Sequence, residues 1–419
     1  MTSVKSVGMV GNQPTRIHRT DLLERYVVRR HEKSWNRLAI FDSIILFAAI
    51  LFSCNCPAMA VDQVTVDIDG VRHRLTGRIV VEAQDGGLLF EEADGKQWLI
   101  QADEIVAREK DATPFVPLEP SEFSKRLKSE LGPKFEIHET AHYLIAYDTT
   151  PAFAFWVGSL YERLYRGFNT YWKQRKIELH DPEFPMVVLI FGDQTDYRNY
   201  ASQDLGGDAG GIVAYYQMLT NRVVLFDITG VEAATSNQQR IRNADQINRL
   251  LSQPAAGAMV ATIVHEATHQ IAYNAGMQQR LADIPMWLNE GLAMFFETPD
   301  LRSRTGWRGI GAINPIRLPR FKQLLVTRQP DSLHQMLTND DRFRNSDTAL
   351  DAYAESWAMV YFLTKVYREE FADYLRELSE ASPLVDGDSE SRVELFKKHF
   401  GEDLNAFDQK FIRLMSRLK

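Results

Sequence analysis

The chain has 419 residues, of which 45% are hydrophobic and 25% charged, so it is long and apolar enough to bury the cores of two or three domains. This composition excludes intrinsic disorder for most of its length. With 48 Lys and Arg against 56 Asp and Glu, the formal net charge is -8. Proteins that bind phosphate backbones usually carry a basic stripe, so we expect no nucleic-acid partner.

The N-terminal segment has the features of an export signal. A basic stretch precedes the apolar run Leu38–Phe52, and Ala58–Ala60 fits the small-x-small pattern for cleavage. Residues 1–60 are therefore predicted to be a secretory signal peptide, which implies a periplasmic or cell-envelope location. Two alternatives stay open, and either would tether the protein to a membrane. One is an uncleaved anchor, although a span normally needs about 20 apolar residues; the other is a lipid on Cys54.

The segment that follows predicts a small all-β module over residues 61–110. Apolar and polar residues alternate there, and Asp-Gly pairs, which favour tight hairpin turns, interrupt the pattern at Asp69, Asp85 and Asp94. We expect a barrel-like module or a compact sheet, without catalytic residues. The proline-containing residues 111–122 are predicted to be a linker, and residues 123–419 to form the second domain.

Residues 123–419 mix strand and helix patterns. His142–Tyr147 and Met186–Phe191 are apolar runs typical of buried strands, whereas Pro151–Lys173 has apolar residues at helical spacing. Helical spacing returns from Asp351 to the C-terminus. We therefore expect an α+β fold, with a mixed sheet followed by a C-terminal helical subdomain.

The sequence His265–His269 matches the H-E-x-x-H motif. On a helix this spacing places the imidazoles of His265 and His269 one turn apart on the same face, where both can bind one metal ion. The two cysteines, Cys54 and Cys56, lie far from it, so any metal is held by His, Asp or Glu. Hydrogen-bonded histidines on a buried helix are the alternative interpretation.

A second apolar segment supplies a third candidate ligand. Trp287–Phe296 is predicted to be a helix, and it carries Glu290. Two histidines and one glutamate with an open fourth position are the ligands of catalytic zinc in thermolysin-like enzymes, so zinc is the predicted cofactor. Glu266 lies between the histidines and is our candidate general base. The alternative for Glu290 is a surface carboxylate favoured by the helix dipole.

These motifs carry a family resemblance. His265–Gln270 together with Trp287–Ala293 resembles the gluzincin metallopeptidases, specifically the peptidase-MA-like group of exported, mostly uncharacterised bacterial proteins. The resemblance extends to Asn221–Asp227 and Tyr353–Ala358. It implies a zincin-like catalytic domain, with zinc on the two histidines and Glu290, and with Asn221–Asp227 as the edge strand that lines the substrate cleft.

The chain departs from thermolysin-like sequences at one position. There an Asp four residues beyond the ligand Glu orients a zinc-bound histidine, whereas this chain has Met294. Glu297, one turn further, is an alternative to that Asp, but we interpret it as a solvated residue on the helix surface. The resemblance also implies a downstream Tyr or His that stabilises the oxyanion, for which Tyr353 is our candidate. Weaker candidates are Tyr215, Tyr216 and His334.

The sequence thus predicts zinc-dependent hydrolysis of peptide bonds in an extracytoplasmic peptide or protein substrate. The alternative is a non-catalytic envelope binding or structural protein that keeps the zincin fold. A complete set of Glu266, the two histidines and Glu290 favours the enzyme, because a protein without activity has no need of the base.

Overall fold

The structure is a computed structural model that describes residues 60–207, 211–229, 243–253, 256–298, 309–385 and 387–419, together with Leu301 and Trp307. The predicted signal segment lies outside these residues except for Ala60. The chain divides into two compact units, one ending at Pro117 and one beginning at Leu118. Within the described ranges, no helix has the length and apolar character that crossing a bilayer requires.

The first unit is an antiparallel five-stranded sheet with the order β4-β3-β2-β1-β5. Asp69 and Gly70 both have positive φ in the β1–β2 turn, as a tight hairpin requires. The edge strands β4 and β5 do not pair, so the barrel-like arrangement is wrong, and the module is an open sheet with a small core of its own. Its strands are β1 (Ala60–Ile68), β2 (Val71–Glu82), β3 (Leu88–Glu92), β4 (Gln97–Ile100) and β5 (Ile105–Pro114).

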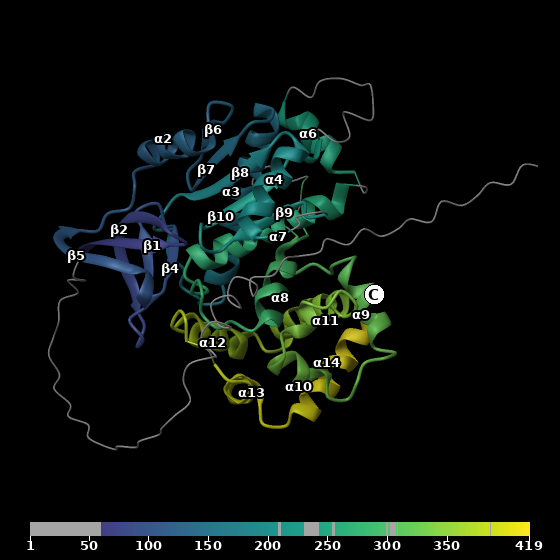
Figure 1. Cartoon of the computed structure of the whole chain (residues 1–419). Helices are drawn as coiled ribbons and strands as arrows, with labels where there is room; N and C mark the ends of the chain where they lie inside the picture. The colour runs from purple at the N-terminus through teal and green to yellow at the C-terminus, as the bar shows by residue number, and fades with distance from the viewer. Residues whose placement is uncertain are drawn as a thin grey trace, which may run out of the picture. The chain divides into compact units, whose positions relative to one another are not determined.

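The second unit is built on a mixed sheet with the order β6-β7-β8-β10-β9 (Figure 1). The three inner strands are parallel, and β6 and β9 pair antiparallel at the edges. Every residue of β8 is buried, which is typical of a strand covered on both faces. The strands are β6 (Glu136–Glu139), β7 (Tyr143–Tyr147), β8 (Met186–Phe191), β9 (Ala214–Gln217) and β10 (Arg222–Phe226).

This strand order corrects one expectation. Asn221–Asp227, implied to be the edge strand, contains β10, which pairs with β8 on one side and with β9 on the other. After β8 the chain forms β9 at the edge of the sheet and then turns inward through Asn221, whose φ is +57°. The edge strand beside the helix that carries the H-E-x-x-H motif is therefore β9.

Helices pack around this sheet. Thr150 caps the N-terminus of α3 by accepting a hydrogen bond from the Phe153 amide, and Pro151 takes the first helical position, where its missing N–H costs nothing. Helix α7 contacts α3, β9 and β10. The helices of this part are α2 (Pro120–Leu131), α3 (Pro151–Lys173), α4 (Gln194–Leu205), α6 (Ala244–Leu251) and α7 (Gly257–Asn274).

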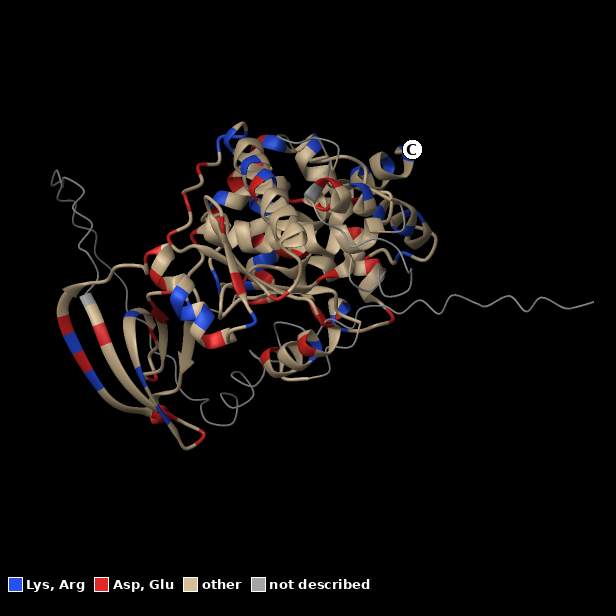
Figure 2. Ribbon diagram, turned by 90° about the horizontal axis from the view of Figure 1, so that it is seen from above, with Lys and Arg blue, Asp and Glu red and all other residues tan. Residues whose placement is uncertain are grey.

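The C-terminal part is helical, which confirms the predicted α+β class (Figure 1). Helix α11 packs against α8 and α9, and its buried Glu355 pairs with Arg328 and Arg342. Basic and acidic residues are intermixed along the helices (Figure 2). The helices are α8 (Met286–Phe296), α9 (Arg317–Leu324), α10 (Ser332–Thr338), α11 (Ala349–Val366), α12 (Arg368–Ser379), α13 (Ser389–Phe400) and α14 (Leu404–Arg417).

Candidate metal centre

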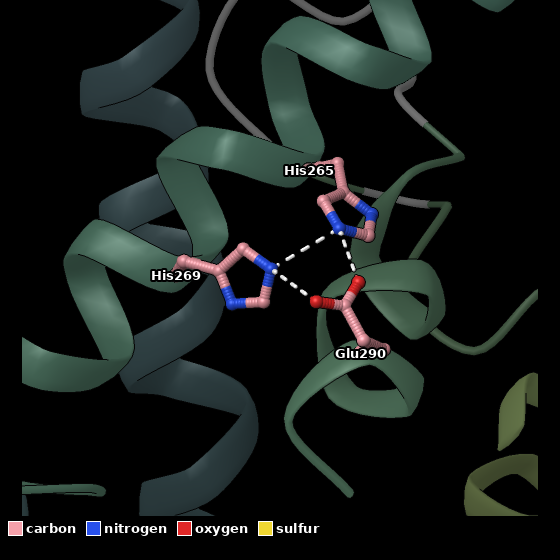
Figure 3. Close-up of side chains that lie close together, drawn as sticks. All are labelled: His265, His269 and Glu290. Carbon is pink, nitrogen blue, oxygen red and sulfur yellow. Dashed lines mark hydrogen bonds and ion pairs between the residues drawn. The ribbon is translucent and has the colours of Figure 1, made fainter. Parts of the chain in front are cut away.

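Helices α7 and α8 bring the three predicted ligands together. His265 and His269 lie one turn apart on α7, and Glu290 faces them from α8 (Figure 3). The Nε2 atom of His265 is 3.1 Å from Nε2 of His269 and 3.1 Å from Oε2 of Glu290. Nε2 of His269 is 3.7 Å from Oε1 of Glu290. All three residues are buried, and their ligand atoms converge on one point.

These distances suit a shared metal ion. Ligand atoms about 2.1 Å from a tetrahedral ion lie roughly 3.4 Å apart, close to the separations of His265, His269 and Glu290. Two imidazole nitrogens and one carboxylate oxygen are ligands that zinc accepts, although other divalent metals accept them too. The His265, His269 and Glu290 group can therefore hold a metal ion, and its chemistry alone does not set which one.

Glu297 contacts the ring nitrogen of His265 that does not face Glu290 and His269. Its interpretation as a solvated residue is therefore wrong. Its side chain is buried, and Oε2 lies 3.1 Å from Nδ1 of His265. Asn314 and Arg317 each donate a hydrogen bond to its other oxygen, at 2.9 Å and 3.0 Å. Glu297 follows Glu290 by seven residues, two helical turns, so both carboxylates reach the same side of α8. That spacing was the signal available in the sequence.

The surroundings of Glu297 favour its ionised form. Burial alone would raise the pKa of this carboxyl, but the Arg317 charge and the hydrogen bonds from His265 and Arg317 outweigh burial and lower the pKa to about 2. An ionised Glu297 is an acceptor for an Nδ1–H of His265, and in a neutral ring this tautomer has an unprotonated Nε2, the nitrogen that faces the centre. Carboxylates commonly fix the orientation of metal-binding histidines in this way.

Glu266 faces β9 from α7 and is not part of the ligand group. It is buried, and its Oε2 accepts a hydrogen bond of 3.0 Å from the backbone N–H of Tyr216. Tyr161 and Tyr197 are buried nearby: burial raises the pKa of both phenols, and the Glu266 charge raises them further. The candidate base therefore sits in an apolar, aromatic environment beside the metal ligands.

Tyr353 lies on α11 and is partly buried. Its ring packs edge-on against Phe343 with the centroids 5.3 Å apart, and the guanidinium of Arg317 lies 5.7 Å from its centroid. Because Arg317 also binds Glu297, Tyr353 is connected to His265 through two side chains. Its role as oxyanion donor stays a prediction.

The weaker candidates have other surroundings. The hydroxyl of Tyr215 donates to Asp204 at 2.8 Å, and that of Tyr216 donates to Asn221 at 2.9 Å. His334 is exposed on α10. Among these three, Tyr216 reaches the site, but through its backbone amide, which no side-chain pattern in the sequence reveals.

Comparison with known proteins adds a family without an assigned activity. Residues 259–385 match a family model described as a protein of unknown function, DUF1570. The matched segment contains the three candidate ligands, Glu266 and Tyr353. No curated protein matches the chain. A function must therefore be argued from the site.

Proposed function

We propose that this protein is a zinc-dependent metallopeptidase that hydrolyses peptide bonds outside the cytoplasm. The observation that carries the proposal is the buried convergence of His265, His269 and Glu290, with Glu266 beside the ligands but not among them. A merely structural metal site closes its coordination with protein ligands, whereas three ligands leave a position for water or substrate.

Each side chain then has a separate task. His265, His269 and Glu290 would hold the zinc ion, which when bound supplies a Lewis acid that polarises a carbonyl and lowers the pKa of water. Glu266 accepts a proton from the attacking water and delivers it to the leaving amine. Glu297 keeps the His265 ring oriented, and Tyr353 is the candidate donor to the oxyanion.

Metal analysis and hydrolysis of casein or a peptide mixture test the proposal. The wild-type protein should contain one equivalent of zinc and cleave peptides. Glu266→Gln should retain that zinc and the fold but lower turnover by a factor of about 10² to 10⁴, because the amide cannot accept the water proton. Undiminished hydrolysis by Glu266→Gln would exclude this mechanism. A wild-type protein without zinc and without hydrolysis would support the binding or structural alternative.

The extracytoplasmic location rests on the sequence of residues 1–60. Mass spectrometry of the native protein distinguishes the three processing routes. A mature N-terminus at Val61 indicates cleavage, a lipid on Cys54 indicates a lipoprotein, and an intact Leu38–Phe52 in the membrane fraction indicates an anchor. Recovery of the full-length chain from the cytosol would contradict this part of the proposal.

A further inference from the structure

The edge strand β9 directs one of its backbone amides at Glu266. Tyr216 lies opposite Val223 of β10, and residues of an antiparallel pair alternate between bonding to the partner strand and facing away from it. The Tyr216 N–H faces away from β10 and donates to Oε2 of Glu266 at 3.0 Å. A strand at the edge of the sheet thus directs one of its backbone donors at the candidate base.

A buried amide network fixes this strand against α7. Asn221, in the turn after β9, exchanges two hydrogen bonds with Asn274 of α7, at 2.8 Å and 2.7 Å. Gln270 donates to the carbonyls of Asn221 and Val187, at 2.8 Å and 3.0 Å. The Tyr216 hydroxyl donates to Asn221 as well. The helix that carries Glu266 is therefore tied to Asn221, at the end of the β9–β10 turn, and to β8.

This network matters because β9 has only four residues, and the turn that follows a hairpin strand helps to set its register. A slip by one residue would displace Tyr216 by about 3.3 Å along the strand and turn its N–H toward the opposite side. The bond to Glu266 would then be lost. A glutamate side chain has several rotatable bonds, so losing this bond would widen the range of rotamers that Glu266 samples.

We propose that the backbone amide of Tyr216 is the positioning donor of Glu266, and that Asn221, Asn274 and Gln270 hold this amide in register. Charge-assisted hydrogen bonds of this kind are stronger than neutral ones, so one amide can select a rotamer. The contact itself is a property of the folded chain. Its catalytic consequence rests on the proposed peptidase function.

Amide hydrogen exchange tests the contact without an activity assay. In the full chain labelled with ¹⁵N-tyrosine, Tyr216→Phe identifies the Tyr216 signal by its disappearance. Glu266→Ala should accelerate exchange of the Tyr216 amide at least about tenfold, because the amide loses its acceptor. Glu266→Gln should preserve slow exchange, since its side-chain oxygen still accepts. Tyr374, inside α12, should be unaffected. Equal Tyr216 exchange in the wild type and Glu266→Ala would overturn the proposal.

A proline substitution tests the consequence for turnover. Tyr216→Pro removes the N–H, and an edge strand tolerates proline where the N–H faces outward. The matched control is Ala214→Pro, two residues earlier on the same side of β9. Tyr216→Pro should lower kcat on the order of 100-fold with KM and zinc content unchanged, because misplacement of a catalytic group by 1 Å costs about that much. Ala214→Pro should retain kcat. Tyr216→Phe keeps the backbone N–H but loses the hydroxyl bond to Asn221, so it should lower kcat far less than Tyr216→Pro does.

The two measurements separate the two proposals. If Glu266→Ala releases the Tyr216 amide but the wild-type protein hydrolyses no peptide, the contact stands and the peptidase function fails. If the wild type is active and Tyr216→Pro retains the kcat of Ala214→Pro with zinc bound, the positioning role is wrong and the peptidase function stands.

Discussion

His265 presents its two ring nitrogens to two buried carboxylates, and the two contacts have different consequences. Nε2 faces the ligand Glu290, whereas Nδ1 faces the supporting Glu297. A substitution that removes the imidazole ring removes both contacts. His265→Ala or His269→Ala should therefore release the metal, because two remaining protein ligands form an incomplete site. Elemental analysis after dialysis checks this, and a full equivalent of zinc in both variants would show that the site is assigned wrongly.

A substitution at Glu297, which contacts Nδ1 of His265, should lower metal affinity less than the loss of a ligand does. In Glu297→Gln the side-chain oxygen can still accept from His265, but the charge that Arg317 pairs with is gone. We expect metal affinity to fall by a factor of about 10 to 100, the usual cost of altering such a partner. Competition with a chelator measures the affinity. Glu380→Gln, at an exposed glutamate after α12, is the control and should bind as the wild type does.

At the residue scale, the ligand set could be predicted from sequence because helical periodicity fixes where His265 and His269 point. The support from Glu297 could be predicted only in part, because its spacing from Glu290 places it on the same side of α8 but does not show that it is buried. A carboxylate that follows an apolar helix has the same local pattern whether it is solvated or buried, and Glu297 is buried by the segment carrying Asn314 and Arg317. That contact depends on tertiary packing between separate elements, which local periodicity does not encode.

At the scale of elements, the position of Glu290 depends on how closely α8 approaches α11. A Cβ atom added at Gly291 would lie 2.6 Å from Cγ2 of Val360 and 2.7 Å from the Ser356 carbonyl oxygen. Gly291→Ala should therefore force the helices apart, lower the free energy of unfolding by about 1–3 kcal/mol and weaken metal binding, since Glu290 is the adjacent residue.

A matched substitution at a second helical glycine shows whether the loss of stability at Gly291 comes from the close approach of α8 and α11. Alanine ordinarily stabilises a helix relative to glycine by roughly 0.5–1 kcal/mol. At Gly257, the first residue of α7, an added Cβ has no neighbour within 4 Å. Gly257→Ala should leave stability unchanged or raise it, whereas Gly291→Ala should lower it. Thermal unfolding of both variants checks the contrast, and equal stabilisation by both would contradict the close packing of α8 and α11.

The strands could be predicted as elements but not in their order. The apolar runs at β8 and β10 and the turn through Asn221 are local features of the sequence. Whether β9 or β10 lies at the edge depends on which of them pairs with β8, a contact between residues far apart in the chain. The family resemblance also placed the wrong strand at the edge. Sheet order is decided by non-local pairing, which motifs constrain only weakly.

At the scale of the whole molecule, the strand pairing of the N-terminal module is also something that local sequence patterns do not determine. Alternation and Asp-Gly turns predicted its strands, but closure into a barrel would require β4 to pair with β5, and no local pattern reports on that pairing. Two elements extend into the predicted linker 111–122, because β5 continues to Pro114 and α2 starts at Pro120. Polar residues with prolines resemble a linker even where they form an exposed edge strand.

These boundaries determine where the chain can be divided. Residues 118–419 form one compact unit that contains the candidate ligands, Glu266, Glu297 and Arg317, whereas the module before it has a separate core. A fragment that begins at Leu118 should therefore fold and bind one equivalent of metal with the affinity of the full chain. Circular dichroism and metal titration measure both properties.

The complementary module should end at Pro117, because ending it at Lys110 would remove the last residues of β5 and shorten its pairing with β1. If the fragment from Leu118 is insoluble or free of metal while the full chain binds metal, the two units depend on each other for folding.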